Sequence, residues 1–151
     1  QQQPRNARAI YLLAVQHAEL GLTARAAAGI KIALLIEPDL ELARFQLGLL
    51  LLFDNNEPIE ARGYLDRLRT SQNRALRAYA EAMIAICDNR MTLARQKLVV
   101  GLAESSPDSP LALLMRRVLE SMLSNSEEQG AVDKTEVNSP LSFAARRPSL
   151  S

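Results

Sequence analysis

Two registers repeat every 34 residues along this chain of 151 residues. One register holds the aromatic residues Tyr11, Phe45 and Tyr79. The other holds very small residues three positions later, Ala14, Gly48 and Ala82. With only three Tyr, three Phe and no Trp in the chain, half of the aromatic residues fall into one register. A small residue lets neighbouring helices approach closely, so this period predicts a repeated pair of helices.

The composition favours helices over sheets. Ala, Leu and Arg are abundant, and these residues lose little on entering a helix, whereas sheets draw on β-branched and aromatic residues. Aromatic residues make up only 4% of the chain, and 48% of the residues are hydrophobic, which is enough to cover a sizeable core. We therefore expect an all-α protein of one domain.

Apolar spacing and turn signals predict two helix pairs in the first half of the chain. The first pair covers residues 6–20 and 23–36, with Gly21 as terminator and Thr23 as N-cap. The second pair covers residues 39–53 and 58–70, with Asp39 as N-cap and Pro58 in the first turn of the later helix.

The same signals predict three further helices. The third pair covers residues 73–87 and 92–103, and a seventh helix covers residues 110–123 with Ser109 and Pro110 at its start. The period slips once, because Ala26 and Ala61 are 35 residues apart and Ala61 and Ala94 are 33 apart. One residue is therefore gained before Ala61 and lost after it.

These helices define the predicted domain organisation. A repeat domain spans residues 5–124, with repeats at about 7–40, 41–74 and 75–108 and a capping helix at 110–123 that covers the last pair. Residues 125–151 are polar and aperiodic, which predicts a disordered tail or linker. Its apolar residues Leu141, Phe143 and Leu150 suggest an alternative, in which the tail docks into an apolar groove of its own molecule or a neighbour.

Little in the sequence supports catalysis or a cofactor. His17 and Cys87 are the sole histidine and cysteine, no signature motif surrounds either, and the six glycines do not form a phosphate-binding loop. We expect a protein that is not an enzyme and that holds no metal or cofactor. The formal charge of +1 gives the whole molecule no reason to bind nucleic acid.

The longest apolar run, residues 47–53, is too short to cross a membrane. We therefore expect no insertion of this chain into a bilayer. The sequence leaves the compartment open between cytoplasm and periplasm, and its start at Gln1 is compatible with a processed or excised fragment.

The repeated unit resembles the tetratricopeptide repeat over residues 7–104. The resemblance rests on the pairs Leu13-Ala14 and Leu47-Gly48 in the first helices, on an alanine in each second helix, and on Pro38 at the end of the first unit. The large aromatic residue that the family places early in each first helix is replaced by Ile10, Arg44 and Ala78. Residues 42–68 are also similar to repeat domains of bacterial surface-assembly and secretion-assembly proteins.

The resemblance implies a right-handed superhelical solenoid whose concave face, lined by first helices, holds a peptide or a helix of a protein partner. Carried over by position, the groove consists of Tyr11, Val15, Leu42, Phe45, Leu49, Leu52, Tyr79, Met83 and Ile86, with Arg8, Glu19 and Leu76 beside them. This surface is largely apolar and lacks the Lys and Asn that clamp an acidic C-terminus.

Three alternatives stay open at this stage. The aromatic register is as well explained by packing between helices as by partner binding, and exposure decides between the two. Arginines between the second and third pairs, Arg67, Arg69, Arg74 and Arg77, suggest either a secondary contact for an acidic partner or ordinary surface residues. The chain is alternatively a self-assembly module, a homo-oligomer within a larger assembly such as one of secretion or the cell envelope.

Overall fold

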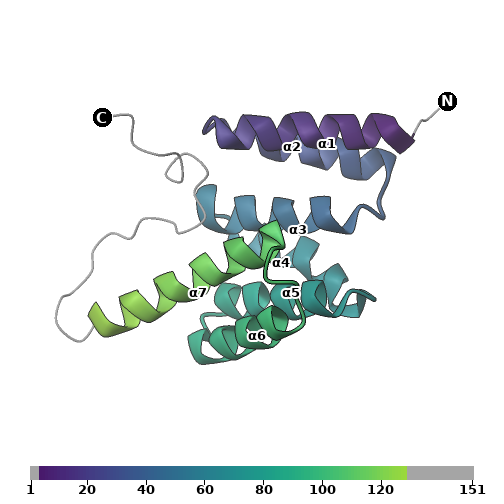
Figure 1. The fold of residues 1–151 in the computed structure, drawn as a ribbon. Coiled ribbons are helices and arrows are strands. Elements are labelled where there is room, and N and C mark those ends of the chain that lie inside the picture. The colour runs from purple at the N-terminus through teal and green to yellow at the C-terminus, as the bar shows by residue number, and fades with distance from the viewer. Residues whose placement is uncertain (1–3, 129–151) are drawn as a thin grey trace. The chain divides into compact units, whose positions relative to one another are not determined.

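The computed structural model describes residues 4–128, which fold into helices and turns without a β-strand (Figure 1). The predicted all-α class is therefore confirmed for this stretch. The chain falls into two compact units that separate after Leu65, a division that the one-domain expectation did not include. The predicted tail from residue 129, with Leu141, Phe143 and Leu150, lies outside the described residues.

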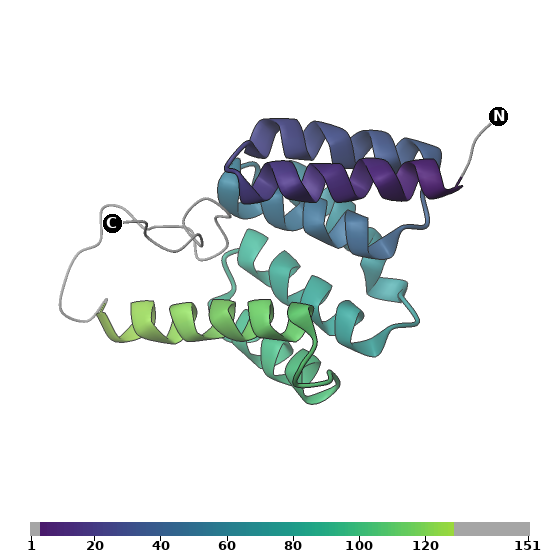
Figure 2. The ribbon, with the colours of Figure 1, turned by 45° about the horizontal axis from the view of Figure 1, so that its top comes forward.

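The N-terminal unit, residues 4–65, begins with α1 (Pro4–Glu19) and α2 (Thr23–Ile36), which run side by side in both views (Figures 1 and 2). It continues with α3 (Glu41–Leu49), the π-helical segment η1 (Leu50–Asp54) and α4 (Pro58–Asp66), whose last residue falls in the next unit. Lys31 of α2 and Glu60 of α4 form an ion pair of 2.9 Å, and the hydrogen bond between them raises the pKa of Lys31.

The C-terminal unit, described here over residues 66–128, contains a short 3₁₀ segment, η2 (Arg67–Thr70), and then α5 (Arg74–Cys87), α6 (Met91–Ala103) and α7 (Pro110–Glu128). Its interior consists of fully buried side chains from α5, α6 and α7, among them Tyr79, Met83, Leu98, Met115 and Val118. Helix α7 continues five residues beyond the predicted end at Leu123, into the polar sequence that was expected to be tail.

Helix starts differ from the prediction in the N-terminal unit. The carbonyls of Leu22 and Leu40 accept the first helical hydrogen bonds of α2 and α3, so these leucines are the N-caps and make no side-chain cap bond. Thr23 is therefore already inside α2, and Asp39 lies in the turn before α3. The cap at Ser109 is confirmed, because its Oγ accepts from the backbone N–H of Ala112 at 3.3 Å.

The turn after the first helix of each pair contains a residue with positive φ. These residues are Gly21 (φ 84°), Asn56 (φ 54°) and Asn89 (φ 61°). Glycine and asparagine are the residues that adopt this left-handed conformation most readily, so the three turns have a common chemical cause. The predicted terminator Gly21 is confirmed.

The π-helical segment explains the slip in the sequence period. The N–H after each left-handed residue donates back to the preceding helix, from Leu22 to His17 and from Arg90 to Ala85, five positions earlier. In the second pair the N–H of Glu57 reaches Leu51, six positions earlier. A π-helical turn holds one more residue than an α-turn, so η1 accommodates the residue gained between Gly48 and Ala61. The compensating loss falls in the stretch that holds the tighter segment η2.

Small residues allow close helix contacts in all three pairs. A Cβ atom placed on Gly29 would lie 3.0 Å from the Cβ of Ala14, and one on Gly48 would lie 2.6 Å from Cδ2 of Leu65. On Gly101 it would collide with the ring of Tyr79. The small register at Ala14 and Gly48 therefore does bring helices together, as predicted, whereas the third pair uses a glycine that the register does not contain.

Candidate partner-binding surface

The predicted groove residues divide by exposure. Four of them have no exposed surface in the structure: Phe45, Leu49, Tyr79 and Met83. Their side chains belong to the interior, so for these positions burial favours the packing explanation over partner binding. The aromatic register is thus mainly a core feature in α3 and α5.

The other five groove positions retain accessible surface. Tyr11 and Val15 on α1, Leu52 in η1 and Ile86 on α5 are half-buried. Leu42, near the start of α3, is 48% exposed and is the most accessible apolar residue of the predicted groove. Burial raises the pKa of Tyr11 to about 12, so the Tyr11 hydroxyl stays neutral at physiological pH.

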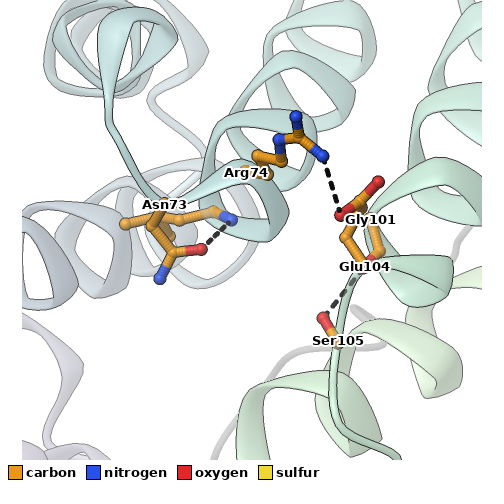
Figure 3. Close-up of polar contacts among 6 residues, drawn as sticks. Asn73, Arg74, Gly101, Glu104 and Ser105 are labelled. Carbon is orange, nitrogen blue, oxygen red and sulfur yellow. Dashed lines mark hydrogen bonds and ion pairs between the residues drawn. The ribbon is translucent and has the colours of Figure 1, made fainter.

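Tyr79 anchors a small polar cluster inside the C-terminal unit. Its hydroxyl lies 2.6 Å from Oγ of Ser105. That Oγ donates to the carbonyl of Gly101 at 2.8 Å (Figure 3). Burial raises the pKa of Tyr79, against the opposing effects of the Ser105 hydrogen bond and of the Arg116 charge. The cluster joins α5 to the turn that follows α6, which is a structural task.

Most arginines of the predicted secondary contact form hydrogen bonds or ion pairs within the C-terminal unit. Arg77 donates to the carbonyl of Ser71 at 2.9 Å, and Arg69 pairs with Asp66 at 3.1 Å. Arg74 approaches Glu104 at 3.8 Å, as Figure 3 shows. Arg67 is exposed on η2. Local pairing supports the simpler interpretation of ordinary surface residues for three of the four arginines.

Arg44 is a buried residue whose role the sequence did not indicate. It occupies the position where the tetratricopeptide pattern has a large aromatic residue, and it is 7% exposed. Its Nη2 donates to the carbonyl of Pro38 at 3.0 Å, and its guanidinium carbon lies 5.9 Å from the ring centroid of Tyr64. A cation within cation–π range of an aromatic ring therefore occupies the position where an aromatic residue was expected.

Several large aliphatic residues outside the predicted groove are strongly exposed. In the N-terminal unit they include Ile59 on α4 and six residues on α1 and α2 and in the turns beside them: Leu12, Leu13, Leu20, Leu22, Ile32 and Leu35. Sequence reasoning missed them because periodicity shows which residues share a helix face but not whether another element covers that face.

Residues 4–128 contain no group of three or more His, Cys, Asp or Glu side chains placed to hold a metal ion. Over the same stretch, no helix combines the length and the apolar character that crossing a membrane requires. His17 and Cys87 are both half-buried helix residues.

Comparison of the chain with protein-family models, with curated proteins and with solved structures finds no match. The resemblance to the tetratricopeptide repeat therefore rests on the residues quoted above, and it stays a prediction.

Proposed function

We propose that this chain is a non-enzymatic interaction module, built from tetratricopeptide-like helix pairs, that holds a partner polypeptide on the surface of its first helices. The observation that carries the proposal is Leu42. It exposes a large apolar side chain on α3, one turn before the fully buried Phe45, and so offers an apolar contact on a firmly packed helix.

The accessible groove residues suggest how such a partner is recognised. Leu42 is joined on the predicted surface by the half-buried Tyr11 and Val15 of α1. An amphipathic helix or an extended peptide that buries one or two large apolar side chains suits a surface of this kind. Exposed charges beside it, such as Arg8 and Glu41, would favour particular partners more than they would add affinity.

Self-assembly, the alternative expectation, receives less support from the surface of the capping helix α7. Its exposed leucines, Leu113 and Leu123, are separated by the exposed charges Arg117 and Glu120. A face of this mixed composition is typical of solvent exposure.

The proposal is tested by capture of partners on the immobilised full chain, with Leu42→Glu compared with wild type. Burying a carboxylate without a partner costs several kcal/mol, so a specific partner should be lost. The matched control is Ile59→Glu, because Ile59 is an aliphatic residue on α4 with 89% of its surface exposed. Partners are then purified and their affinities measured by calorimetry.

Unchanged affinity of every captured partner for Leu42→Glu would contradict the proposal, as would equal losses in both variants. Circular dichroism must first show that each variant keeps its helicity. Phe45→Ala and Tyr79→Ala are unsuitable for this purpose, because both side chains are buried and their removal tests folding.

A further inference from the structure

The two compact units are joined by one uninterrupted helical segment. Helix α4 passes directly into the 3₁₀ segment η2, because Asp66 keeps helical backbone angles of φ −59° and ψ −33°. The division between the units falls inside this segment, after Leu65. The two ends of the segment therefore belong to different units, and each end is held by contacts of its own.

The first part of the segment is anchored in the N-terminal unit. Leu65 is fully buried, and a Cβ atom placed on Gly48 of α3 would lie 2.6 Å from its Cδ2. Ala61, one turn earlier, is also fully buried, and Glu60 pairs with Lys31 of α2 at 2.9 Å. Helix α4 is thus fixed to α2 and α3 as far as Leu65.

The last part of the segment is anchored in the C-terminal unit. Segment η2 packs against α5, and its Leu68 is buried. The next residue after η2, Ser71, is buried as well, and its carbonyl accepts from Nη1 of Arg77 at 2.9 Å. Its Oγ accepts from the backbone N–H of Asn73, the cap of α5, at 3.1 Å. The chain from Leu68 onward is thus fixed to α5.

Between the two anchors lie Asp66 and Arg67, and both are exposed. Asp66 also forms an ion pair with Arg69 at 3.1 Å, but the two side chains are 52% and 51% exposed, so solvent weakens the attraction. At this point the helix changes from α to 3₁₀ geometry, in which hydrogen bonds are less well aligned. A 3₁₀ stretch within a helix often marks a hinge, and hinges consist of a few residues at the ends of elements.

We propose that Asp66 and Arg67 form a hinge about which the two compact units change their relative orientation. The backbone angles of these two residues absorb the rotation, while Leu65 and Leu68 keep their places in their own units. The Asp66–Arg69 pair favours the 3₁₀ form of the segment, because side chains three positions apart eclipse each other in a 3₁₀-helix. The motion therefore requires neither core to unpack.

The test is pulsed electron paramagnetic resonance on the full chain, with pairs of spin labels on introduced cysteines. Cys87 is the sole native cysteine, so Cys87→Ala gives a background in which labels attach only where intended. The cross-unit pair, Gln16→Cys with Gln96→Cys, uses exposed positions on α1 and α6. Two control pairs each lie within one unit, also at exposed positions: Gln16→Cys with Ile59→Cys, and Gln96→Cys with Arg117→Cys.

The distances between the labels should be distributed about twice as broadly for the cross-unit pair as for either control pair, because a hinge displaces whole units. Asp66→Gly/Arg67→Gly should broaden the cross-unit distribution further and leave both control pairs unchanged, since glycine frees the backbone at the hinge. The matched variant Ala24→Gly/Arg25→Gly places two glycines at exposed positions of α2, away from the hinge, and should have no effect on the cross-unit pair. Circular dichroism checks the helicity of every variant.

A cross-unit distribution as narrow as those of the control pairs would overturn the hinge. Equal effects of the two glycine variants would overturn its assignment to Asp66 and Arg67. The inference goes beyond the proposed function and fails independently of it. Leu42 lies on the N-terminal side of the hinge, so Asp66→Gly/Arg67→Gly should leave Leu42-dependent capture intact, and Leu42→Glu should leave the label distances unchanged.

Discussion

The first and third helix pairs share one sequence period but make their closest contacts with different residues. In α1/α2 the small register supplies the contact, where Ala14 meets Gly29. In α5/α6 the aromatic register supplies it, because the ring of Tyr79 lies against Gly101. The period therefore specifies where two helices meet, while either helix can provide the volume that fills the contact.

The same two pairs differ in how completely their first helices are buried. Helix α5 has eight buried residues, whereas over residues 6–19 of α1 the buried residues are the alanines Ala7, Ala14 and Ala18. Tyr79 is fully buried, and Tyr11 at the equivalent position is half-buried. Equivalent positions thus serve the core in one pair and remain partly available at the surface in the other.

The largest expected effect on stability comes from the aromatic register, where Tyr79 and Tyr11 differ in burial. Tyr79→Ala should lower the free energy of unfolding by about 3–5 kcal/mol, because it removes a buried ring and leaves a cavity against Gly101. Tyr11→Ala should cost roughly half as much or less, since the Tyr11 side chain is only half-buried. Urea unfolding followed by far-UV circular dichroism measures both.

Tyr79→Phe is the control for the hydroxyl of Tyr79. It keeps the ring and loses only the hydrogen bond with Ser105, so it should cost about 0.5–1.5 kcal/mol. Equal losses for Tyr79→Ala and Tyr11→Ala would mean that the two aromatic positions are equally buried in solution, contrary to the comparison above.

Much of the helix pattern was predictable from the sequence, and the reasons are local. The bounds of α2, Thr23–Ile36, follow from Gly21 on one side and Pro38 on the other, and Pro110 begins α7 as expected. The π-helical segment was not predicted, although its sign, the one-residue slip before Ala61, was visible. Its cause is that a helix can absorb an extra residue without ending.

The candidate site was less predictable, because exposure depends on neighbouring elements. Register placed Phe45 and Leu42 on one face of α3, but only the folded chain shows that Phe45 is covered and Leu42 is not. Similarly, the apolar character of Leu12 and Leu13 was visible in the sequence, yet a helix pattern alone would equally have assigned them to a core.

Glycine-to-alanine substitutions at the helix contacts should have effects of intermediate size on stability. Gly101→Ala should destabilise the chain by about 1–3 kcal/mol, because the added methyl group collides with the ring of Tyr79. Gly48→Ala should act similarly against Leu65. Gly63→Ala is the matched control on α4, where nothing lies within 4 Å of the new Cβ, and it should stabilise by about 0.5–1 kcal/mol.

The free energies of unfolding of these glycine variants are compared from their urea midpoints, with one m-value for all variants. A destabilising Gly63→Ala would show that helix propensity does not govern this open position. A neutral Gly101→Ala would show that the contact with Tyr79 relaxes enough to admit a methyl group.

The smallest expected effect concerns the helix starts, which again distinguish the two pairs. Helix α5 is capped by Asn73 (Figure 3). The Oδ1 of Asn73 accepts from the backbone N–H of Leu76 at 3.1 Å. The N-cap of helix α2 is Leu22, which makes no side-chain cap bond. Asn73→Ala should therefore cost about 1 kcal/mol, whereas Asn73→Asp should be nearly neutral.

Leu22→Asp offers the converse experiment. Leu22 is exposed, so its loss removes little packing, and a carboxylate at this position both accepts from the free N–H groups of the first turn and interacts favourably with the helix dipole. It should stabilise α2 by about 0.5–1 kcal/mol, measured as a rise in the urea midpoint. A fall in the midpoint would show that the backbone at Leu22, with φ −87° and ψ 67°, cannot adjust to cap geometry.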